Sequence, residues 1–356
     1  MSGCRRRYRG SWLLVVLLIV LGPTGVLAAT DDWDENADIL SDQVLSEPLE
    51  FPSWFKLSFL DLREDLADLR QDGKAALILY FGQKYCAYCK ALLEKDFGLP
   101  DIRRYTQVHF DVIGLDIHGS RMVTDLSGKE MTEKMFALDR HVNFTPTLVF
   151  IDPRGRVALR LNGYYPPYKF RAALEYVADG YYRSERLRDY LARADVPLNF
   201  GDGSLSIEDF FQPPPYNLDR SHWPAQRPLV VFFERPDCHA CDVLHTGPLQ
   251  EPEIHDRLRD FDAVQLNLVR DTPVVTPAGK RLTARQWAAA LNIFYTPTLV
   301  FFDRHGHEIL RVDSVVQFYR LRNVLDYIRS GDWRRYPNFQ QWRERHTAPR
   351  PPAGRQ

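Results

Sequence analysis

Two segments that lie 151 residues apart have nearly the same sequence, and this repeat limits the possible folds more than any other feature. FTPTLVFID at Phe144–Asp152 returns as YTPTLVFFD at Tyr295–Asp303. Other landmarks recur at this offset or one residue more: the C-x-x-C pairs Cys86/Cys89 and Cys238/Cys241, the glycines Gly128 and Gly279, and the threonines Thr132 and Thr283. Because the spacing agrees at so many points, we interpret the chain as an internal duplication.

Each repeat unit has the pattern strand, C-x-x-C, helix, strand, helix, Thr-Pro, strand, turn, strand and helix. We expect Thr132 and Thr283 to cap the helices that follow them, the second with Gln286 in a capping box. The first unit has, in addition, a leading amphipathic helix. Its predicted apolar face consists of Phe59, Leu62, Leu66 and Leu69, and Gly73 is its predicted end.

These patterns divide the mature chain into two domains and their connections. We predict domains at 51–184 and 228–333, a linker with a short helix and a Pro-rich stretch at 185–227, and a C-terminal tail at 334–356. The linker also provides an irregular substitute for the leading helix of the first unit. The last ten residues are expected to be disordered because they contain no apolar face that could pack.

The N-terminus has the pattern of a secretory signal. Four arginines precede the apolar run Trp12–Leu21, and a small-residue site follows at Val26–Ala29. An uncleaved anchor is the alternative, but the run is shorter than the ~20 residues that a spanning helix needs. We therefore predict a signal peptide at 1–28, a flexible segment at 29–50, and no stable membrane insertion after cleavage.

Removal of the signal shifts the formal charge from −1 to −5, because it takes away four arginines and no acidic residue. The remaining charges are mixed along the chain, and nothing in them favours nucleic-acid binding. The predicted location of the soluble mature protein is the periplasm.

All cysteines of the predicted mature chain lie in C-x-x-C motifs. The chain has five cysteines, and Cys4 falls in the signal. A framework of structural disulfides would place cysteines in several loops. The two pairs therefore indicate redox chemistry.

The C-x-x-C after an apolar strand, followed by Thr-Pro before a strand–turn–strand, resembles the thioredoxin superfamily. The segments YCAYCK, GKEMT, TPTLVFID and NGYY of the first unit are most similar to exported thioredoxin-like proteins of bacterial sulfur oxidation. The resemblance implies an α/β protein with two tandem thioredoxin-fold domains, each a central mixed sheet flanked by helices. A tandem pair departs from the usual single domain.

The position of each pair explains how it could exchange disulfides. A cysteine attacks as the thiolate, and backbone N–H groups at a helix N-terminus stabilise that anion. The first cysteine forms a mixed disulfide and the second resolves it. We assign Cys86 and Cys238 as nucleophiles and Cys89 and Cys241 as resolving residues.

The resemblance also gives the Thr-Pro motifs a role. In thioredoxin-like proteins the X-Pro bond facing the C-x-x-C is cis, and the residue before it binds the incoming chain. By this reading, substrate binds at Thr145, Pro146, Thr296 and Pro297. The alternative is an ordinary turn before an edge strand.

Residues beside the cysteines are candidates for tuning the two sites. Tyr88 and Lys90 accompany the first pair, and His239 lies within the second. Thioredoxin has a buried carboxylate six residues before its first cysteine, where this chain has Tyr80 and Phe232. Glu234, four residues before Cys238, is not a clear replacement for that carboxylate.

We predict an exported thiol–disulfide oxidoreductase that reduces disulfides of protein substrates. It would draw electrons from a membrane donor and use no cofactor or metal. A Cys₄ zinc site is disfavoured because 148 residues separate Cys89 from Cys238. Two alternatives remain open: copper binding by Cys238, His239 and Cys241, and a redox-inert peptide-binding or chaperone-like module.

Overall fold

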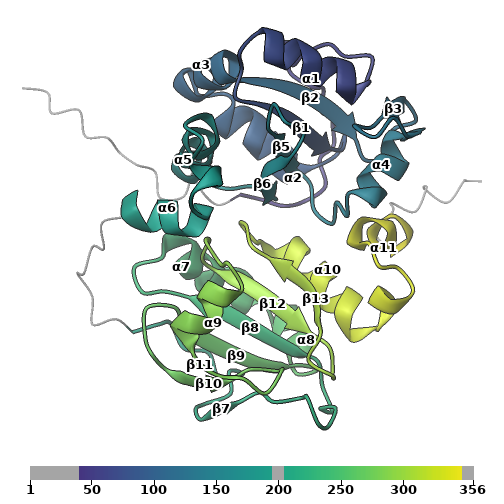
Figure 1. Ribbon diagram of the computed structural model, residues 1–356. Coiled ribbons are helices and arrows are strands. Elements are labelled where there is room, and N and C mark those ends of the chain that lie inside the picture. Colours follow the sequence, from purple (N-terminus) through teal and green to yellow (C-terminus); the bar gives the residue numbers. More distant parts are fainter. Residues whose placement is uncertain (1–39, 195–203, 347–356) are drawn as a thin grey trace, which may run out of the picture. The chain divides into compact units, whose positions relative to one another are not determined.

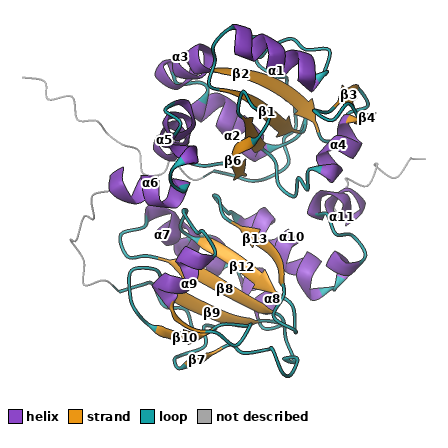
Figure 2. Cartoon of the chain, in the orientation of Figure 1, coloured by secondary structure: helices purple, strands orange, loops and turns teal. Residues whose placement is uncertain are grey.

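The computed structural model describes residues 40–194 and 204–346, and the predicted signal peptide lies outside these ranges (Figure 1). Two four-stranded sheets with helices on their faces form the two halves of the chain (Figure 2). The strand orders are β2-β1-β5-β6 and β9-β8-β12-β13. In each sheet the first two strands are parallel and the remaining neighbours are antiparallel. The predicted α/β class with two mixed sheets is therefore confirmed.

The first half contains the elements coloured purple to teal in Figure 1. They are α1 (Leu62–Gln71), β1 (Ala76–Gly82), α2 (Ala87–Ala91), a π-helix (Leu92–Asp96), α3 (Pro100–His109), β2 (Phe110–Asp116), β3 (Met122–Thr124), β4 (Glu130–Thr132), α4 (Glu133–Asp139), β5 (Thr147–Ile151), β6 (Val157–Asn162), α5 (Pro167–Ala178), a 3₁₀ turn (Tyr181–Arg183) and α6 (Leu187–Ala194).

The second half repeats this order from β8 to α11. Its elements are β7 (Tyr216–Asn217), β8 (Leu229–Glu234), α7 (His239–Thr246), a 3₁₀ turn (Pro248–Gln250), α8 (Pro252–Leu258), β9 (Asp262–Asn267), β10 (Pro273–Val275), β11 (Arg281–Thr283), α9 (Ala284–Ala290), β12 (Thr298–Phe302), β13 (Glu308–Val312), α10 (Phe318–Arg329), a 3₁₀ turn (Asp332–Arg334) and α11 (Phe339–His346).

Strand β1, an inner strand of the first sheet, is buried on both faces. Leu77 and Leu79 point to the layer of α1 and α4, whereas Ile78 and Tyr80 point to the layer of α2, α3 and α5. Alternate residues of a strand face opposite sides of a sheet, so a continuous apolar run fits a sheet covered on both faces. The side chains of β8 likewise alternate between two cores, one on each face of the second sheet.

The leading helix of the first half is shorter than the sequence pattern predicted. Leu62, Leu66 and Leu69 of α1 are buried, but Phe59 lies before the helix with 99% of its surface exposed. The Asp61 side chain accepts a hydrogen bond from the Arg63 N–H, so the helix begins after Asp61 and Phe59 cannot share its apolar face.

Where the first half has the helix α1, the second half has a short strand, β7. Strand β7 comes from the Pro-rich stretch and pairs with β10 in a small sheet, β11-β10-β7. Leu218 and Val274 then pack in the core on that face of the main sheet. The expected helix caps are present: the Thr132 and Thr283 side chains accept the N–H of the third helical residue, and Gln286 completes the capping box.

The predicted C-terminal tail, 334–356, contains the helix α11. Asp42, from the N-terminal segment that we predicted to be flexible, accepts hydrogen bonds from the backbone of α10. The ends of the chain, 1–39 and 347–356, lie outside the described residues. Each core also includes the aromatic residue that precedes the Thr-Pro of the other half: Tyr295 packs in the first core and Phe144 in the second.

Candidate active site

Both C-x-x-C pairs lie where a sheet strand turns into a helix. Cys86 is the N-cap of α2, and its Sγ accepts a hydrogen bond from the Cys89 N–H at 3.0 Å. Cys238 is the N-cap of α7, and its Sγ accepts from the Cys241 N–H at 3.2 Å. Each pair is joined as a disulfide. The backbone thus presents N–H groups to the first sulfur of each pair, an arrangement that stabilises a thiolate after reduction.

A Thr-Pro peptide lies against each first sulfur. The Sγ of Cys86 is 3.4 Å from the hydroxyl oxygen of Thr145, and the Sγ of Cys238 is 3.4 Å from that of Thr296. Thr145-Pro146 and Thr296-Pro297 are cis, as is Pro214-Pro215 in the linker. The structure therefore brings together, in each half, the cysteines and the Thr-Pro that the sequence placed about sixty residues apart.

A chain of hydrogen bonds extends from the first sulfur to the C-terminal helix. Gln83 donates from Nε2 to the Thr145 hydroxyl at 2.8 Å, so the hydroxyl hydrogen can point to Cys86. The Gln83 oxygen lies 3.0 Å from His118 Nε2, and His118 Nδ1 lies 2.5 Å from a Glu344 carboxylate oxygen. Residue Glu344 belongs to α11, so the second half supports the orientation of a group beside the first site.

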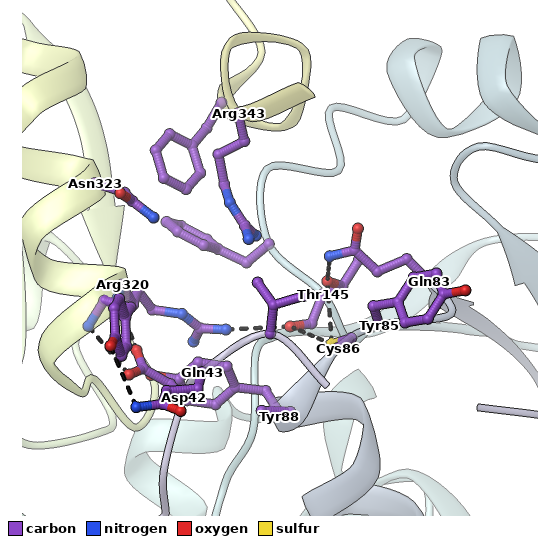
Figure 3. Close-up of a pocket in the computed structure, with 15 residues that line it drawn as sticks. Asp42, Gln43, Gln83, Tyr85, Cys86, Tyr88, Thr145, Arg320, Asn323 and Arg343 are labelled. Atoms are coloured by element: carbon purple, nitrogen blue, oxygen red, sulfur yellow. Dashed lines mark hydrogen bonds between the residues drawn. The ribbon is translucent and has the colours of Figure 1, made fainter. Parts of the chain in front are cut away.

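The pocket at Cys86 combines three segments of the chain (Figure 3). Its volume is about 40 Å³. The lining comes from the N-terminal segment, from the first half and from α10 and α11: Asp42, Gln43, Val44, Gln83, Tyr85, Cys86, Ala87, Tyr88, Phe144, Thr145, Tyr319, Arg320, Asn323, Phe339 and Arg343. Cys86 itself is 5% exposed. The first site is therefore a narrow pocket that is lined by residues of both halves.

Tyr88 connects this pocket to α10. Its hydroxyl donates to Asp42 Oδ2 at 3.0 Å and accepts from the Gln317 N–H at 3.0 Å. The Arg320 guanidinium lies over its ring, 3.4 Å from the centroid. Burial raises the pKa of Tyr88 far above its usual value, so the hydroxyl remains protonated. Tyr88, a candidate for tuning, thus holds the two halves together beside Cys86.

Asp42 caps α10 from a distant part of the sequence. Its carboxylate accepts from the N–H groups of Tyr319 at 3.1 Å and Arg320 at 2.7 Å, whereas the adjacent N-cap Gln317 makes no side-chain cap. Arg320 in turn donates from Nη2 to the Thr145 carbonyl oxygen at 3.1 Å. A residue of the second half therefore occupies a backbone acceptor of the first Thr-Pro.

The other two tuning candidates face solvent. Lys90 is half exposed and forms an ion pair with Glu94, one helical turn away, at 3.9 Å. His239 is exposed at the first position of α7. Within the described part of the chain, neither side chain forms a hydrogen bond with a cysteine sulfur.

A buried polar cluster lies next to α7, the helix that carries the second cysteine pair; its members are His245, Glu234, Glu208 and Gln265. His245 follows Cys241 by four residues on α7, so the two share a helix face. Its Nε2 is 3.1 Å from a Glu234 carboxylate oxygen, and its Nδ1 is 2.8 Å from Glu208. Gln265 donates to Glu234 at 2.8 Å. Burial alone would lower the pKa of His245, but the hydrogen bonds to Glu234 and Glu208 outweigh it and raise that pKa.

The sequence carried a signal for this cluster. Glu234 ends an otherwise apolar strand and is 1% exposed, and an ionisable residue in such a strand needs a partner. The corresponding positions of the first half are Gly82, Leu93 and Gly114, which cannot form the cluster. The first half instead buries Asp96, whose two carboxylate oxygens have no hydrogen-bond partner among the described residues. Burial raises the pKa of Asp96 to about 9, and the charge of Lys95 opposes this rise.

Within the described ranges, no three His, Cys, Asp or Glu side chains are arranged to hold a metal ion. The copper alternative at Cys238, His239 and Cys241 therefore has no support from side-chain placement. In the same ranges, no helix combines the length and apolar character needed to cross a bilayer.

A mixed sheet that presents a C-x-x-C disulfide at a helix N-terminus, with a Thr-Pro against it, defines the class of thioredoxin-fold proteins. The chain belongs to the thioredoxin-like domain family, whose family model matches residues 62–178 and 224–329. The two matched segments correspond to the two halves, so the repeat is a tandem pair of thioredoxin-like domains.

Solved structures give partial similarities. A thioredoxin-fold protein from Helicobacter pylori is 26% identical, with a TM-score of 0.30, over 33% of this chain and 83% of that one. A DsbH oxidoreductase is 17% identical, with a TM-score of 0.27, over 37% and 92%. The N-terminal domain of alkylhydroperoxide reductase AhpF from Enterococcus faecalis is 12% identical, with a TM-score of 0.24, over 78% and 100%. No curated protein matches the sequence.

Proposed function

We propose that this protein is an exported, periplasmic thiol–disulfide oxidoreductase that reduces protein disulfides through both C-x-x-C pairs. One observation supports it above the others: in each half the first sulfur accepts a backbone N–H at a helix start and is 3.4 Å from a threonine hydroxyl. These groups stabilise a thiolate at the atom that must attack. The similarity of the first unit to sulfur-oxidation thioredoxins favours the direction of reduction.

The exchange balances within each pair. The Cys86 or Cys238 thiolate attacks a substrate disulfide, and one substrate thiolate leaves. The thiolate of Cys89 or Cys241 then attacks the mixed disulfide and releases the second substrate thiolate. Two electrons pass to the substrate, and the C-x-x-C pair becomes a disulfide. A dithiol of a membrane electron donor would restore the reduced form by the reverse exchange.

Trapping tests this function directly. In Cys89→Ser and Cys241→Ser variants the attacking cysteine remains but the resolving thiol is absent, so mixed disulfides should accumulate in the exporting cell. The same variants should lose most insulin reduction by the altered site in the presence of dithiothreitol. Matched Cys86→Ser and Cys238→Ser variants should trap nothing at the altered site. Native disulfides that resist dithiothreitol, together with no trapped partner, would instead support the redox-inert peptide-binding alternative.

A further inference from the structure

The Thr145 hydroxyl can stabilise a thiolate at Cys86 only if it donates its hydrogen to the sulfur. The hydroxyl oxygen and the sulfur are 3.4 Å apart, and a thiolate can only accept. A hydroxyl has a single hydrogen, so any other acceptor beside Thr145 would compete with the sulfur for it. The group beside this hydroxyl is the side-chain amide of Gln83, and Figure 3 shows Gln83, Thr145 and Cys86 joined in this order by dashed lines.

The Gln83 amide has two orientations with opposite effects on the sulfur. In the structure its Nε2 donates to the Thr145 hydroxyl oxygen at 2.8 Å, which leaves the hydroxyl hydrogen available to Cys86. In the reverse orientation the amide oxygen would face the hydroxyl and accept its hydrogen, so the sulfur would lose this donor. Because a hydrogen bond to an anion is stronger than a neutral one, the orientation of Gln83 affects how readily Cys86 ionises.

His118 and Glu344 favour the orientation that the structure shows. The Gln83 amide oxygen lies 3.0 Å from His118 Nε2, and since this oxygen only accepts, Nε2 carries a hydrogen. His118 Nδ1 is 2.5 Å from a Glu344 carboxylate oxygen, which also accepts. A ring with hydrogen on both nitrogens satisfies both contacts. If Nε2 lost its hydrogen it would become an acceptor, and the Gln83 amide would turn over to donate to it.

Two further charged side chains contact the outer end of this hydrogen-bond chain. Lys134 of α4 forms an ion pair with Glu344 at 3.0 Å. The Asp116 carboxylate accepts the backbone N–H of His118 at 3.0 Å. His118 is thus held both by the end of β2 and by α11, so a helix of the second half acts on a side chain of the first.

The imidazole of this hydrogen-bond chain has no counterpart in the repeat. The residue equivalent to His118 is Val269: both follow the matching strands β2 and β9, and both donate the backbone N–H to the side chain two residues earlier, Asp116 or Asn267. A valine side chain can neither donate nor accept a hydrogen bond. The step through an imidazole is therefore specific to the first half.

We propose that His118 and Glu344 are positioning residues of the first site. By holding Gln83 in the observed orientation, they direct the Thr145 hydroxyl hydrogen to the Cys86 thiolate. This inference rests on the proposed thiol–disulfide exchange and adds what controls the reactivity of its first nucleophile. A carboxylate of the second half thereby increases the ionised fraction of Cys86, and with it the rate of attack at neutral pH.

The pH dependence of Cys86 alkylation tests this assignment. Full chains in which Cys89, Cys238 and Cys241 are serine are treated with iodoacetamide from pH 4 to pH 9, and mass spectrometry follows the peptide that contains Cys86. On the rising part of the profile, where part of Cys86 is still protonated, His118→Leu should react about threefold more slowly. Where Cys86 is ionised in both chains, the two rates should agree within about twofold.

Neighbouring variants locate the effect. Glu344→Ala should slow the reaction about twofold on the same part of the profile, because the ring then loses its acceptor on α11. His118→Lys supplies only donors, as the doubly protonated ring does, and should keep most of the parent rate. Arg345→Gln changes an exposed residue of the same helix that is not part of the hydrogen-bond chain, and it should leave the profile unchanged.

A Thr145→Val background separates positioning from a general effect on the fold. Valine lacks the hydroxyl, so His118→Leu should have no further effect there. A profile of His118→Leu that equals the parent, a change that is constant over the whole pH range, or an undiminished change in the Thr145→Val background would overturn the positioning role while thiol–disulfide exchange stands. A Cys86 that iodoacetamide modifies at no pH in the parent chain would overturn the exchange itself at this site.

Discussion

Among the described residues, the buried Asp96 carboxyl group of the first half has no hydrogen-bond partner, whereas the second half buries Glu234 against His245 and Gln265. Both halves have the same sheet and the same sulfur geometry at a helix start. The duplication has thus preserved what holds the cysteines in place, while the buried ionisable groups differ. Two sites with the same C-x-x-C spacing can therefore differ in their chemistry, because proton affinity and substrate access depend on residues outside the motif.

The largest effect that separates the two halves is expected from the His245 cluster. His245→Leu leaves Glu234 buried without its cationic partner, and breaking a buried pair in this way costs about 3 kcal/mol of unfolding free energy at pH 6. His239→Leu, an exposed position on the same helix, is the matched control and should have little effect. Urea unfolding of both variants measures the difference. If His245→Leu lowers the unfolding free energy no more than His239→Leu does, His245 does not stabilise the buried Glu234.

The difference in unfolding free energy between wild type and His245→Leu should depend on pH, and the pKa of His245 determines the direction of that dependence. The pKa of His245 is raised in the folded state, so its stabilisation is fully present below the unfolded value of about 6.5 and is lost as pH rises through the folded value. The difference between wild type and His245→Leu should therefore narrow as pH increases above 6.5. A gap that widens over this range would contradict the cationic form of His245.

A smaller effect of opposite direction is expected at Asp96. Because its folded pKa is raised to about 9, folding binds a proton between pH 4 and pH 9, and stability falls as pH rises through that interval. Asp96→Asn removes this proton uptake and should increase the unfolding free energy by roughly 2 kcal/mol at pH 7. The gain should grow from pH 4 to pH 9 in urea unfolding.

Asp209→Asn is the control for this change, because Asp209 is an exposed aspartate of the second half. It should show no such growth with pH. An Asp96→Asn gain that is constant over the interval would mean that the native carboxylate is ionised, and the contrast with the Glu234 cluster would then disappear.

The features that sequence could predict are those that local pattern determines. The repeat, the alternating strands and the capping threonines depend on neighbours within a few residues, and the mixed sheets and both caps at Thr132 and Thr283 were predicted correctly. Phe59 was misplaced because the apolar spacing continued past Asp61, where the helix begins. The contact between Asp42 and Arg320 joins residues 278 positions apart, which no local pattern specifies.

The smallest effect concerns two helix caps, one remote and one local. Asp42→Ala removes the carboxylate that caps α10 and accepts the Tyr88 hydroxyl, and we expect a loss of about 1 kcal/mol in unfolding free energy. Asp61→Ala removes the local cap of α1, and neither Asp61 nor a residue of α1 is among those that line the pocket. The two variants should be compared in the background where Cys238 and Cys241 are serine, so that only the first pair reacts.

The rate at which dithiothreitol reduces the Cys86–Cys89 disulfide distinguishes the two caps, whereas the unfolding free energy alone does not. Asp42→Ala removes the hydrogen bonds that the N-terminal segment accepts from the α10 backbone and from the Tyr88 hydroxyl beside Cys86. Dithiothreitol should then reduce the Cys86–Cys89 disulfide a few-fold faster, as followed by tryptophan fluorescence or thiol labelling. Asp61→Ala should leave that rate unchanged. If both variants react at the wild-type rate, the remote cap stabilises α10 without limiting access to the first sulfur pair, and access to the first site must then depend on the other residues that line its pocket.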